Sequence, residues 1–322
     1  MLAPPQAFRR SRYERQDLGH SPLVVFWETT QACDLACMHC RACAQTRSAP
    51  GQLTTDEARL LVDQLCAFPK PPMLVLTGGD PLKRRDIFEL VSYGTEQGLD
   101  ISITPSATPL VTFDALRQLR NCGIARVAVS LDGADAAMHD SFRGVSGSFD
   151  RTLEILISAE SLGIPVQVNT TVTPRNFGQI DDLANLLGEQ DIVLWSVFFL
   201  VPTGRADTMS RLSAQQYEEV FERLWRNTQR QPYMIKTTEA PHYRRFAALH
   251  PSRKEASSHD ARLKAYPTLG INDGKGVMFV GHTGMVYPSG FMPITCGQFP
   301  VSSLVDIYQN SPVLTALRDS SK

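Results

Sequence analysis

The chain has 322 residues, a formal net charge of −1 at neutral pH and 43% hydrophobic residues. This is the composition of a globular protein with one large domain and a small appendage. The near-neutral charge excludes the strongly basic class that binds nucleic acid or acidic membranes. No stretch approaches the roughly 20 uncharged apolar residues of a membrane span, and residues 1–16 lack a secretory signal's apolar run, so we expect a cytoplasmic protein.

After a polar lead-in at residues 1–20, short apolar strands alternate with amphipathic helices. The first helix begins with a capping box of Thr54 and Glu57, whose side chains can satisfy each other's backbone N–H groups. Strands are predicted at residues 23–28, 73–77, 101–104, 125–131, 165–172 and 192–200, and helices at 54–67, 86–97, 112–121, 148–162, 177–187 and 213–225. Six such units predict an α/β fold with a parallel sheet, in which functional groups lie at the carboxyl ends of the strands.

The pattern changes towards the C-terminus. Residues 233–239 are a candidate extra strand, and the polar, unpatterned residues at about 249–268 predict a flexible loop. Residues 277–280 and 285–287, joined by a Gly-His-Thr-Gly turn, predict a β-hairpin, and a short helix is predicted at 303–309. We therefore divide the chain into a lead-in at 1–20, an incomplete barrel at 21–240 and an extension at 241–322.

Four of the seven cysteines lie within eleven residues, at Cys33, Cys37, Cys40 and Cys43. An odd number of cysteines, clustered in a chain without an export signal, indicates metal binding or redox chemistry. Cys33, Cys37 and Cys40 directly follow the first strand, and thiolates are the natural ligands of Fe–S clusters. Three ligands would leave one iron of a four-iron cluster open. A zinc site, or a closed electron-transfer cluster that uses Cys43, is the alternative; we interpret Cys43 as a bystander.

The stretch from Glu28 to Cys40 (ETTQACDLACMHC) resembles the signature of the radical S-adenosylmethionine (SAM) superfamily, in which a residue such as His39 often precedes the third cysteine. The resemblance implies a partial (β/α)6 barrel and a [4Fe–4S] cluster on the three cysteines. It also implies an enzyme in which the reduced cluster cleaves SAM to a 5′-deoxyadenosyl radical that abstracts hydrogen from a substrate. A reductant of the flavodoxin or ferredoxin type is then needed.

The same resemblance implies a set of SAM contacts. The turn after the second strand, TGGDP, is similar to the family's Gly-Gly-Glu-Pro motif, so Gly78, Gly79 and Asp80 are expected at the SAM amino group. An ordinary strand-to-helix turn is the alternative. Ser130 and Arg143 are expected at the SAM carboxylate, which a guanidinium suits.

Other polar residues fall at further strand ends. Asp132 either contacts the substrate or caps a turn. Ser106 follows the third strand, while Gln167 and Asn169 share one face of the fifth and bind either the SAM ribose or a core water. Val201 follows the sixth strand and is expected near the adenine. The sequence assigns no catalytic residue.

Residues 284–290 and Cys296 resemble the start of a SPASM extension, which carries auxiliary Fe–S clusters. Residues 195–200 and 236–243 resemble radical SAM/SPASM proteins of haem and haem d1 biosynthesis, which modify porphyrin propionates. Peptide-modifying maturases are the alternative branch. Because Cys296 is the last cysteine, we interpret the extension as truncated and its auxiliary cluster as doubtful.

A polar cluster follows the last barrel element, formed by His242, Tyr243, Arg244 and Arg245. One interpretation is a solvated loop, because charged residues are mostly exposed. The other is that its cations meet substrate carboxylates such as propionates.

Overall fold

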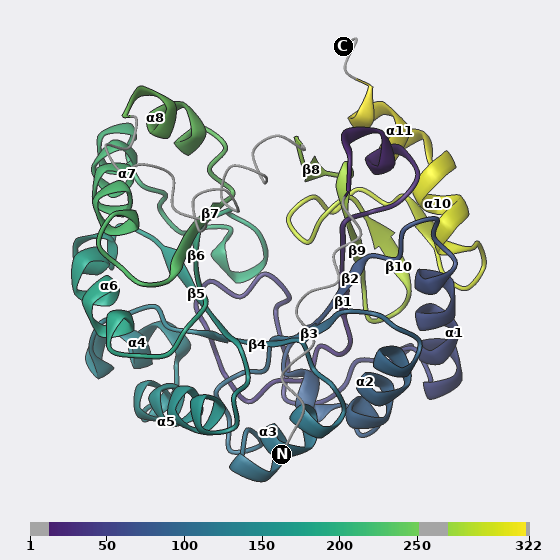
Figure 1. Ribbon diagram of the computed structural model, residues 1–322, viewed down its shortest axis with the longest axis horizontal. Helices are drawn as coiled ribbons and strands as arrows, with labels where there is room; N and C mark the ends of the chain where they lie inside the picture. The colour runs from purple at the N-terminus through teal and green to yellow at the C-terminus, as the bar shows by residue number, and fades with distance from the viewer. Residues whose placement is uncertain (1–12, 251–269, 320–322) are drawn as a thin grey trace.

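The computed structural model describes residues 13–250 and 270–319, and it contains a curved sheet with helices on its outer side (Figure 1). The hydrogen-bonded order is β11-β10-β9-β1-β2-β3-β4-β5-β6-β7, and β8 pairs with β9 off this path. In this order, each neighbouring pair of strands from β9 and β1 up to β6 and β7 is parallel. Strand β10 is antiparallel to both of its neighbours, β9 and β11. The strands are β1 (Val24–Glu28), β2 (Met73–Thr77), β3 (Ile101–Ile103), β4 (Arg126–Ser130), β5 (Val166–Val172), β6 (Leu194–Phe199), β7 (Met234–Thr238), β8 (Asn272–Asp273), β9 (Gly276–Val280), β10 (Met285–Tyr287) and β11 (Gly297–Gln298).

The six predicted strand–helix units are present, and the partial barrel is confirmed. At the start of α1, Thr54 accepts a hydrogen bond from the Glu57 N–H, and the Glu57 carboxylate accepts one from the Thr54 N–H, as the capping box predicts. The short helices α4, α8 and α11 were not predicted. The helices are α1 (Thr55–Cys66), α2 (Ile87–Glu96), α3 (Phe113–Asn121), α4 (Ala136–Arg143), α5 (Ser148–Ser161), α6 (Ile180–Gly188), α7 (Ala214–Thr228), α8 (Tyr243–Leu249), α10 (Leu304–Asn310) and α11 (Pro312–Arg318).

The two faces of the curved sheet differ in their access to solvent. In β5 Val166 and Val168 are buried, whereas Gln167 and Asn169 between and beyond them are partly exposed. Successive side chains of a strand point to opposite faces, so the buried set lies under the helices and the partly exposed set faces inward. β2 has the same alternation. The inner face of the barrel is therefore partly open to solvent.

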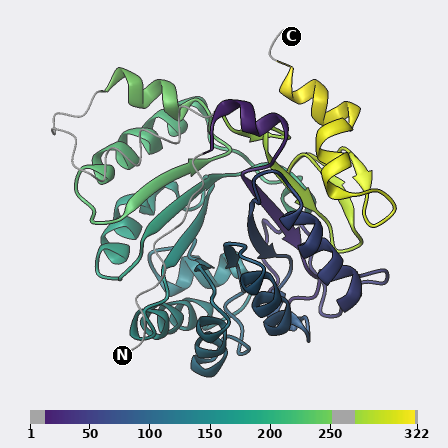
Figure 2. The same cartoon turned by 45° about the vertical axis from the view of Figure 1, so that its right-hand side comes forward.

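The C-terminal extension adds to the barrel sheet. The predicted hairpin is confirmed as β9 and β10, and β9 also pairs in parallel with β1, which was not expected. Figure 2 shows α10 beside α1, where the Leu304 N–H donates to the Gln64 side chain at 2.6 Å, and α11 packs on α10. Among the described residues no strand pairing joins β7 to β8 or β9, so the sheet stays open there.

The N-terminal segment also packs on this extension. Residues Arg15–Gly19 form a 3-10 helix in which Leu18 is fully buried. The Tyr308 hydroxyl of α10 donates to the Leu18 carbonyl at 2.8 Å and accepts the Gly276 N–H at 2.9 Å. The flexible loop expected at about 249–268 lies almost wholly outside the described residues. Over the described ranges no helix is both long and apolar enough to cross a membrane.

Candidate cofactor site

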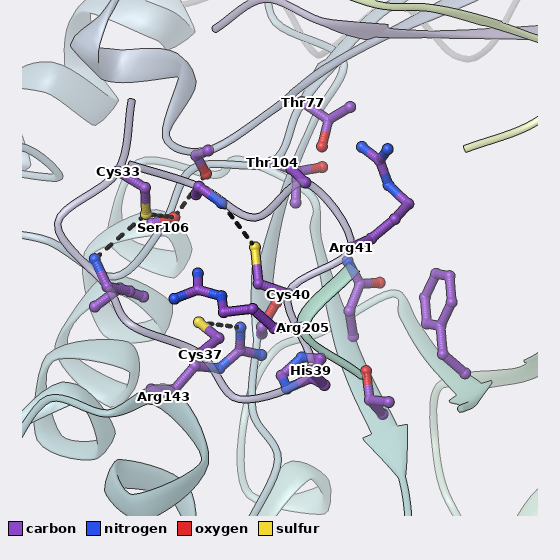
Figure 3. Close-up of a pocket in the computed structure, with 18 of the residues that line it drawn as sticks. Cys33, Cys37, His39, Cys40, Arg41, Thr77, Thr104, Ser106, Arg143 and Arg205 are labelled. Carbon is purple, nitrogen blue, oxygen red and sulfur yellow. Dashed lines mark hydrogen bonds between the residues drawn. The ribbon is translucent and has the colours of Figure 1, made fainter. Parts of the chain in front are cut away.

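A cavity of about 250 Å³ opens at the carboxyl ends of the barrel strands, beside the loop that carries the clustered cysteines (Figure 3). This is the edge at which parallel α/β sheets place functional groups. Ten of the twelve residues proposed from sequence line it: Cys33, Cys37, Cys40, Gly78, Gly79, Ser106, Ser130, Arg143, Asn169 and Val201.

Asp80 and Gln167 are the two candidates that do not line the cavity. The Asp80 carboxylate is fully buried, where it accepts hydrogen bonds from the Thr108 hydroxyl at 2.7 Å and the Leu82 N–H at 3.1 Å. These hydrogen bonds hold the Asp80 carboxylate inside the turn, while its contact with the SAM amino group stays a prediction. Gln167 is two residues before Asn169 on β5, further from the carboxyl edge of the sheet, and its side-chain amide donates to the Asn169 side-chain oxygen at 2.7 Å.

The glycines of the Thr-Gly-Gly-Asp-Pro turn serve a close contact between two backbones. A Cβ on Gly78, whose φ is +144°, would stand 2.3 Å from the Thr30 carbonyl oxygen. One on Gly79 would stand 2.3 Å from the Ala32 carbonyl oxygen. Side chains cannot be accommodated at such distances, so this turn holds the segment that leads into Cys33.

The three sulfur atoms expected to bind iron each have a partner near the cavity. Cys33 Sγ is 3.3 Å from the Ser106 hydroxyl, and the Arg143 guanidinium donates to Cys37 Sγ at 3.6 Å. Cys40 Sγ accepts the Ala44 N–H at 3.4 Å. Cys43 is exposed and does not line the cavity. This placement favours three thiol ligands over the closed cluster that would need Cys43.

Arg143 is held by a buried ion pair. Asp132, with no exposed surface, pairs with the Arg143 guanidinium and accepts the Thr171 N–H at 2.7 Å. Burial would raise the pKa of Asp132, but the Arg143 charge outweighs burial and holds that pKa below its usual value. In this structure the Asp132 carboxylate therefore orients Arg143.

Arg205 is a cavity residue that the sequence patterns did not reveal. Its guanidinium contacts Cys40, and its Nε and one Nη are buried without a hydrogen-bond partner among the described residues. The backbone N–H of Arg205 donates to the Cys40 carbonyl at 3.0 Å. A Cβ on the preceding Gly204, at φ +61°, would stand 2.3 Å from the Arg41 carbonyl oxygen, so this turn packs directly on the cysteine loop.

The donor set fits an Fe–S cluster with an anionic ligand beside it. The sulfur-only ligands are those that such clusters prefer, and Arg143 and Arg205 bring positive charge to Cys37 and Cys40 (Figure 3). Buried nitrogens of both guanidinium groups lack partners among the described residues and are suited to a carboxylate. His39 faces the same cavity, and burial lowers its pKa to about 4, so it is neutral at pH 7.

A second polar group links the cysteine loop to the C-terminal hairpin. Buried Glu28, at the end of β1, accepts from Arg41 at 2.8 Å and contacts His282 Nδ1 at 2.9 Å. The Arg41 guanidinium also lies 4.5 Å from the centre of the Phe279 ring. His282 belongs to the Gly-His-Thr-Gly turn of the hairpin. The structure shows that it braces the strand from which the cysteine loop emerges.

Replacing Glu28 with Gln is expected to lower the free energy of unfolding at pH 7 by about 1.5–3 kcal/mol, the range for hydrogen bonds to charged groups. Burial alone would raise the pKa of Glu28, but His282 and Arg41 outweigh it and lower that pKa. A lowered folded-state pKa stabilises the protein above the unfolded value of about 4.3, and the effect is lost as pH falls through the folded pKa.

Urea unfolding of wild type and Glu28→Gln at pH 7 and below pH 4 measures this difference. The difference in the free energy of unfolding between the two proteins should be large at pH 7 and should disappear in acid. Glu89→Gln is the matched control, because Glu89 forms an exposed ion pair with Arg59 and is expected to change stability by less than about 1 kcal/mol. A gap independent of pH would contradict the ion-pair account.

The other cysteines have ordinary surroundings. Cys66 and Cys122 are partly buried against the core, as expected for small hydrophobic residues. Cys296 is also partly buried, and its thiol donates to the Ile294 carbonyl at 3.5 Å. Burial raises the pKa of Cys296 to about 11, so the thiol is protonated at neutral pH.

A half-open parallel barrel with a three-cysteine loop at its carboxyl edge is the architecture of a radical SAM enzyme. Residues 27–187 match the family model of the radical SAM superfamily, and the chain belongs to that superfamily. It is 38% identical over 305 residues to the AdoMet-dependent heme synthase of Methanosarcina barkeri, an alignment that covers 94% of this chain and 86% of that protein. The AdoMet-dependent heme synthase of Nitratidesulfovibrio vulgaris is 37% identical, with 89% and 79% covered.

A solved structure with the same fold is Streptococcus suis SuiB bound to S-adenosylmethionine. The two match with a TM-score of 0.73 at 16% identity, over 93% of this chain and 68% of that one. At this identity the likeness concerns the fold alone.

Proposed function

We propose that this radical SAM enzyme holds a [4Fe–4S] cluster on Cys33, Cys37 and Cys40 and binds SAM in the adjoining cavity. The observation that carries the proposal is the meeting of these three thiols with two arginines in one cavity at the strand ends. When bound, the reduced cluster and SAM supply a 5′-deoxyadenosyl radical that removes a hydrogen atom from a substrate. A flavodoxin- or ferredoxin-type protein is the proposed reductant.

The protein's own residues bind and orient SAM. Arg143, fixed by Asp132, and Arg205 offer buried nitrogens to the SAM carboxylate. Ser130 and Asn169 present polar groups along one wall, and Val201 gives the apolar contact proposed for the adenine. Ser106 stands beside Cys33 and contributes to the cluster end of the cavity rather than to the SAM end.

The proposed substrate is a porphyrin that carries propionate side chains, and the proposed reaction is oxidative decarboxylation of the haem-biosynthesis type. Removal of one hydrogen atom by the 5′-deoxyadenosyl radical, followed by loss of carbon dioxide and of one electron to an oxidised flavodoxin- or ferredoxin-type protein, would convert a propionate to a vinyl group. Support comes from the heme synthases to which most of the chain is similar. We further propose that residues 21–240 form the catalytic unit. Residues 241–322 would brace it through His282 and β9, with no auxiliary cluster assigned because Cys296 stands alone.

The test is anaerobic reconstitution with iron, sulfide, SAM and dithionite, followed by addition of an iron porphyrin tetrapropionate. We expect 5′-deoxyadenosine in all reactions with SAM. With the porphyrin we expect a product lighter by one carbon dioxide and two hydrogens for each propionate converted to a vinyl group. Mass spectrometry and chromatography of the nucleoside measure both.

The two parts of the proposal fail separately in this experiment. If the reconstituted protein holds an Fe–S cluster but forms no 5′-deoxyadenosine, it is an electron carrier. If it is colourless and holds zinc, the proposed cluster is ruled out. If 5′-deoxyadenosine forms but the porphyrin is unchanged, the SAM chemistry stands and the porphyrin is the wrong substrate. A peptide substrate is then the next candidate.

A further inference from the structure

Polar side chains line the inner face of β4–β7, next to the cavity. In the parallel register Ser130 pairs with Asn169, Asn169 with Ser196 and Ser196 with Lys236, so the four share one face of the sheet. Ser130 and Asn169 line the cavity, and Lys236 therefore lies on the same inner face. Arg126, four residues before Ser130 on β4, is also on this face by the strand period of two.

Lys236 is the centre of a group of cations. As a whole residue Lys236 keeps solvent-exposed surface, while protein atoms surround its ammonium end. No carboxylate of the described residues forms an ion pair with it. Arg126 donates to the Gln167 side-chain oxygen at 3.1 Å. The pKa of Lys236 is lowered, first because protein atoms bury its ammonium and then because Arg126 and Arg244 carry like charges nearby. These cations are therefore close enough to interact.

Two acids belong to the open side of the sheet, one directly after β7 and one on β8, and Figure 1 labels both strands. Glu239 follows β7 at φ +61°, an uncommon conformation for a residue with a side chain. Burial raises the pKa of Glu239, and Asp273 on β8 raises it further, while Lys236 acts in the opposite direction. Neither acid pairs directly with Lys236 in the described structure. The ammonium is thus available to a negative group from outside.

We propose that Lys236, with Arg126 and Arg244 beside it, binds a carboxylate of the substrate on the inner face of the barrel. This inference rests on the proposed function and names the residues that would recognise its propionates. Ammonium and guanidinium groups form charge-assisted hydrogen bonds with carboxylates, and these are stronger in partly desolvated surroundings than in water. Lys236 is on β7, and Phe198 of the neighbouring strand β6 lines the cavity. A molecule whose carboxylate is bound by Lys236 would therefore place its adjoining carbon atoms towards that cavity.

The structure separates two neighbouring arginines that the sequence had grouped together. Arg244 acts on Lys236, whereas Arg245 forms an ion pair with Glu218 on the surface of α7. We therefore assign only Arg244 to the substrate carboxylate, since the Arg245 charge is already paired outside the barrel. Arg245 is therefore the matched control for Arg244, because the same substitution removes the same charge from the adjacent position.

A lysine on an edge strand has a second explanation. β7 ends the run of barrel strands, and inward-pointing charges on edge strands can serve only to prevent pairing with other chains. In that case Lys236 would matter for solubility and have no effect on ligand affinity. The two explanations therefore make opposite predictions for binding.

The test is an absorbance titration of the reconstituted holoenzyme, without dithionite, using an iron porphyrin tetrapropionate and its tetramethyl ester. For the acid we expect Kd to rise about tenfold or more in Lys236→Gln and in Arg244→Gln, the size of one lost charge-assisted hydrogen bond. Arg245→Gln should bind as wild type does, and Lys236→Arg should keep most of the affinity. Wild type should prefer the acid to the ester, and Lys236→Gln should lose most of that preference.

Uncoupled formation of 5′-deoxyadenosine shows which variants are folded and loaded. If active Lys236→Gln binds the acid with unchanged Kd, or keeps the full preference over the ester, the carboxylate site is wrong while the proposed function stands. If wild type forms 5′-deoxyadenosine but binds neither porphyrin, the porphyrin proposal and this site both fail. If Lys236→Gln is inactive in SAM cleavage, Lys236→Arg and Arg244→Gln decide the question by the same titration.

Discussion

Replacing Asp132 with Asn is expected to destabilise the protein by about 3–5 kcal/mol, the cost of removing one member of a buried ion pair. Asp132 has no exposed surface, and Arg143 is 9% exposed. The substitution keeps the size of the side chain and its acceptor for the Thr171 N–H, but it leaves the Arg143 charge buried without a counter-charge. Burial of an uncompensated charge is among the largest single effects that a point substitution can have.

Denaturant unfolding of the apoprotein measures this cost without involving the cluster. The double variant Asp132→Asn, Arg143→Gln should regain part of the lost stability, because it removes the stranded charge as well. Asp135→Asn is the control: Asp135 is exposed and caps α4 by accepting the Met138 N–H, which Asn does equally well. A single variant as stable as wild type, or a double variant less stable than the single, would rule out this account.

The second large effect is expected from Cys37→Ala, which should abolish cluster assembly and reduce 5′-deoxyadenosine formation by more than about 100-fold, beyond the range for groups that only support metal ligands. Cys37 is buried, lines the cavity and accepts from Arg143. A cluster with only two of its three thiolates loses the protein's hold on it. The same result is expected for Cys33→Ala and Cys40→Ala.

Cys43→Ala is the matched control, because Cys43 is on the same loop but is exposed and outside the cavity lining. It should retain iron, sulfide and 5′-deoxyadenosine formation close to those of wild type. Iron and sulfide content, the visible absorption of the cluster and the SAM cleavage rate are measured for the variants side by side. If Cys43→Ala also loses the cluster, a four-cysteine site has to replace the three-cysteine one.

The sequence by itself determined the barrel and its cysteine loop. The alternation of buried and partly exposed residues in β5 and the capping box at Thr54 are local patterns, and each was enough to predict its own strand or helix. The spacing of Cys33, Cys37 and Cys40 is local as well. Because parallel strands end at one edge, predicting the strands also predicted where the polar residues would gather.

Other features were decided only by the tertiary structure, since they join residues far apart in the chain. His282 meets Glu28 across 254 positions, and no local pattern contains that pairing. Arg205 reaches Cys40 because the turn at Gly204 packs on the cysteine loop. Asp80 is a further example: the sequence motif did not reveal that its carboxylate is buried and accepts hydrogen bonds from Thr108 and Leu82.

Adjacent arginines show the same limit at the proposed substrate site. Arg244 and Arg245 are chemically identical, yet one lies close to Lys236 and the other pairs with Glu218. A helix turns by about 100° for each residue, so neighbours in sequence face different surroundings, and only the packing of α8 decides which. Periodicity therefore determined where strands, helices and cysteines lie. The partner of each charged side chain depended on the fold, because a buried or half-buried charge is satisfied by whatever the tertiary structure brings beside it.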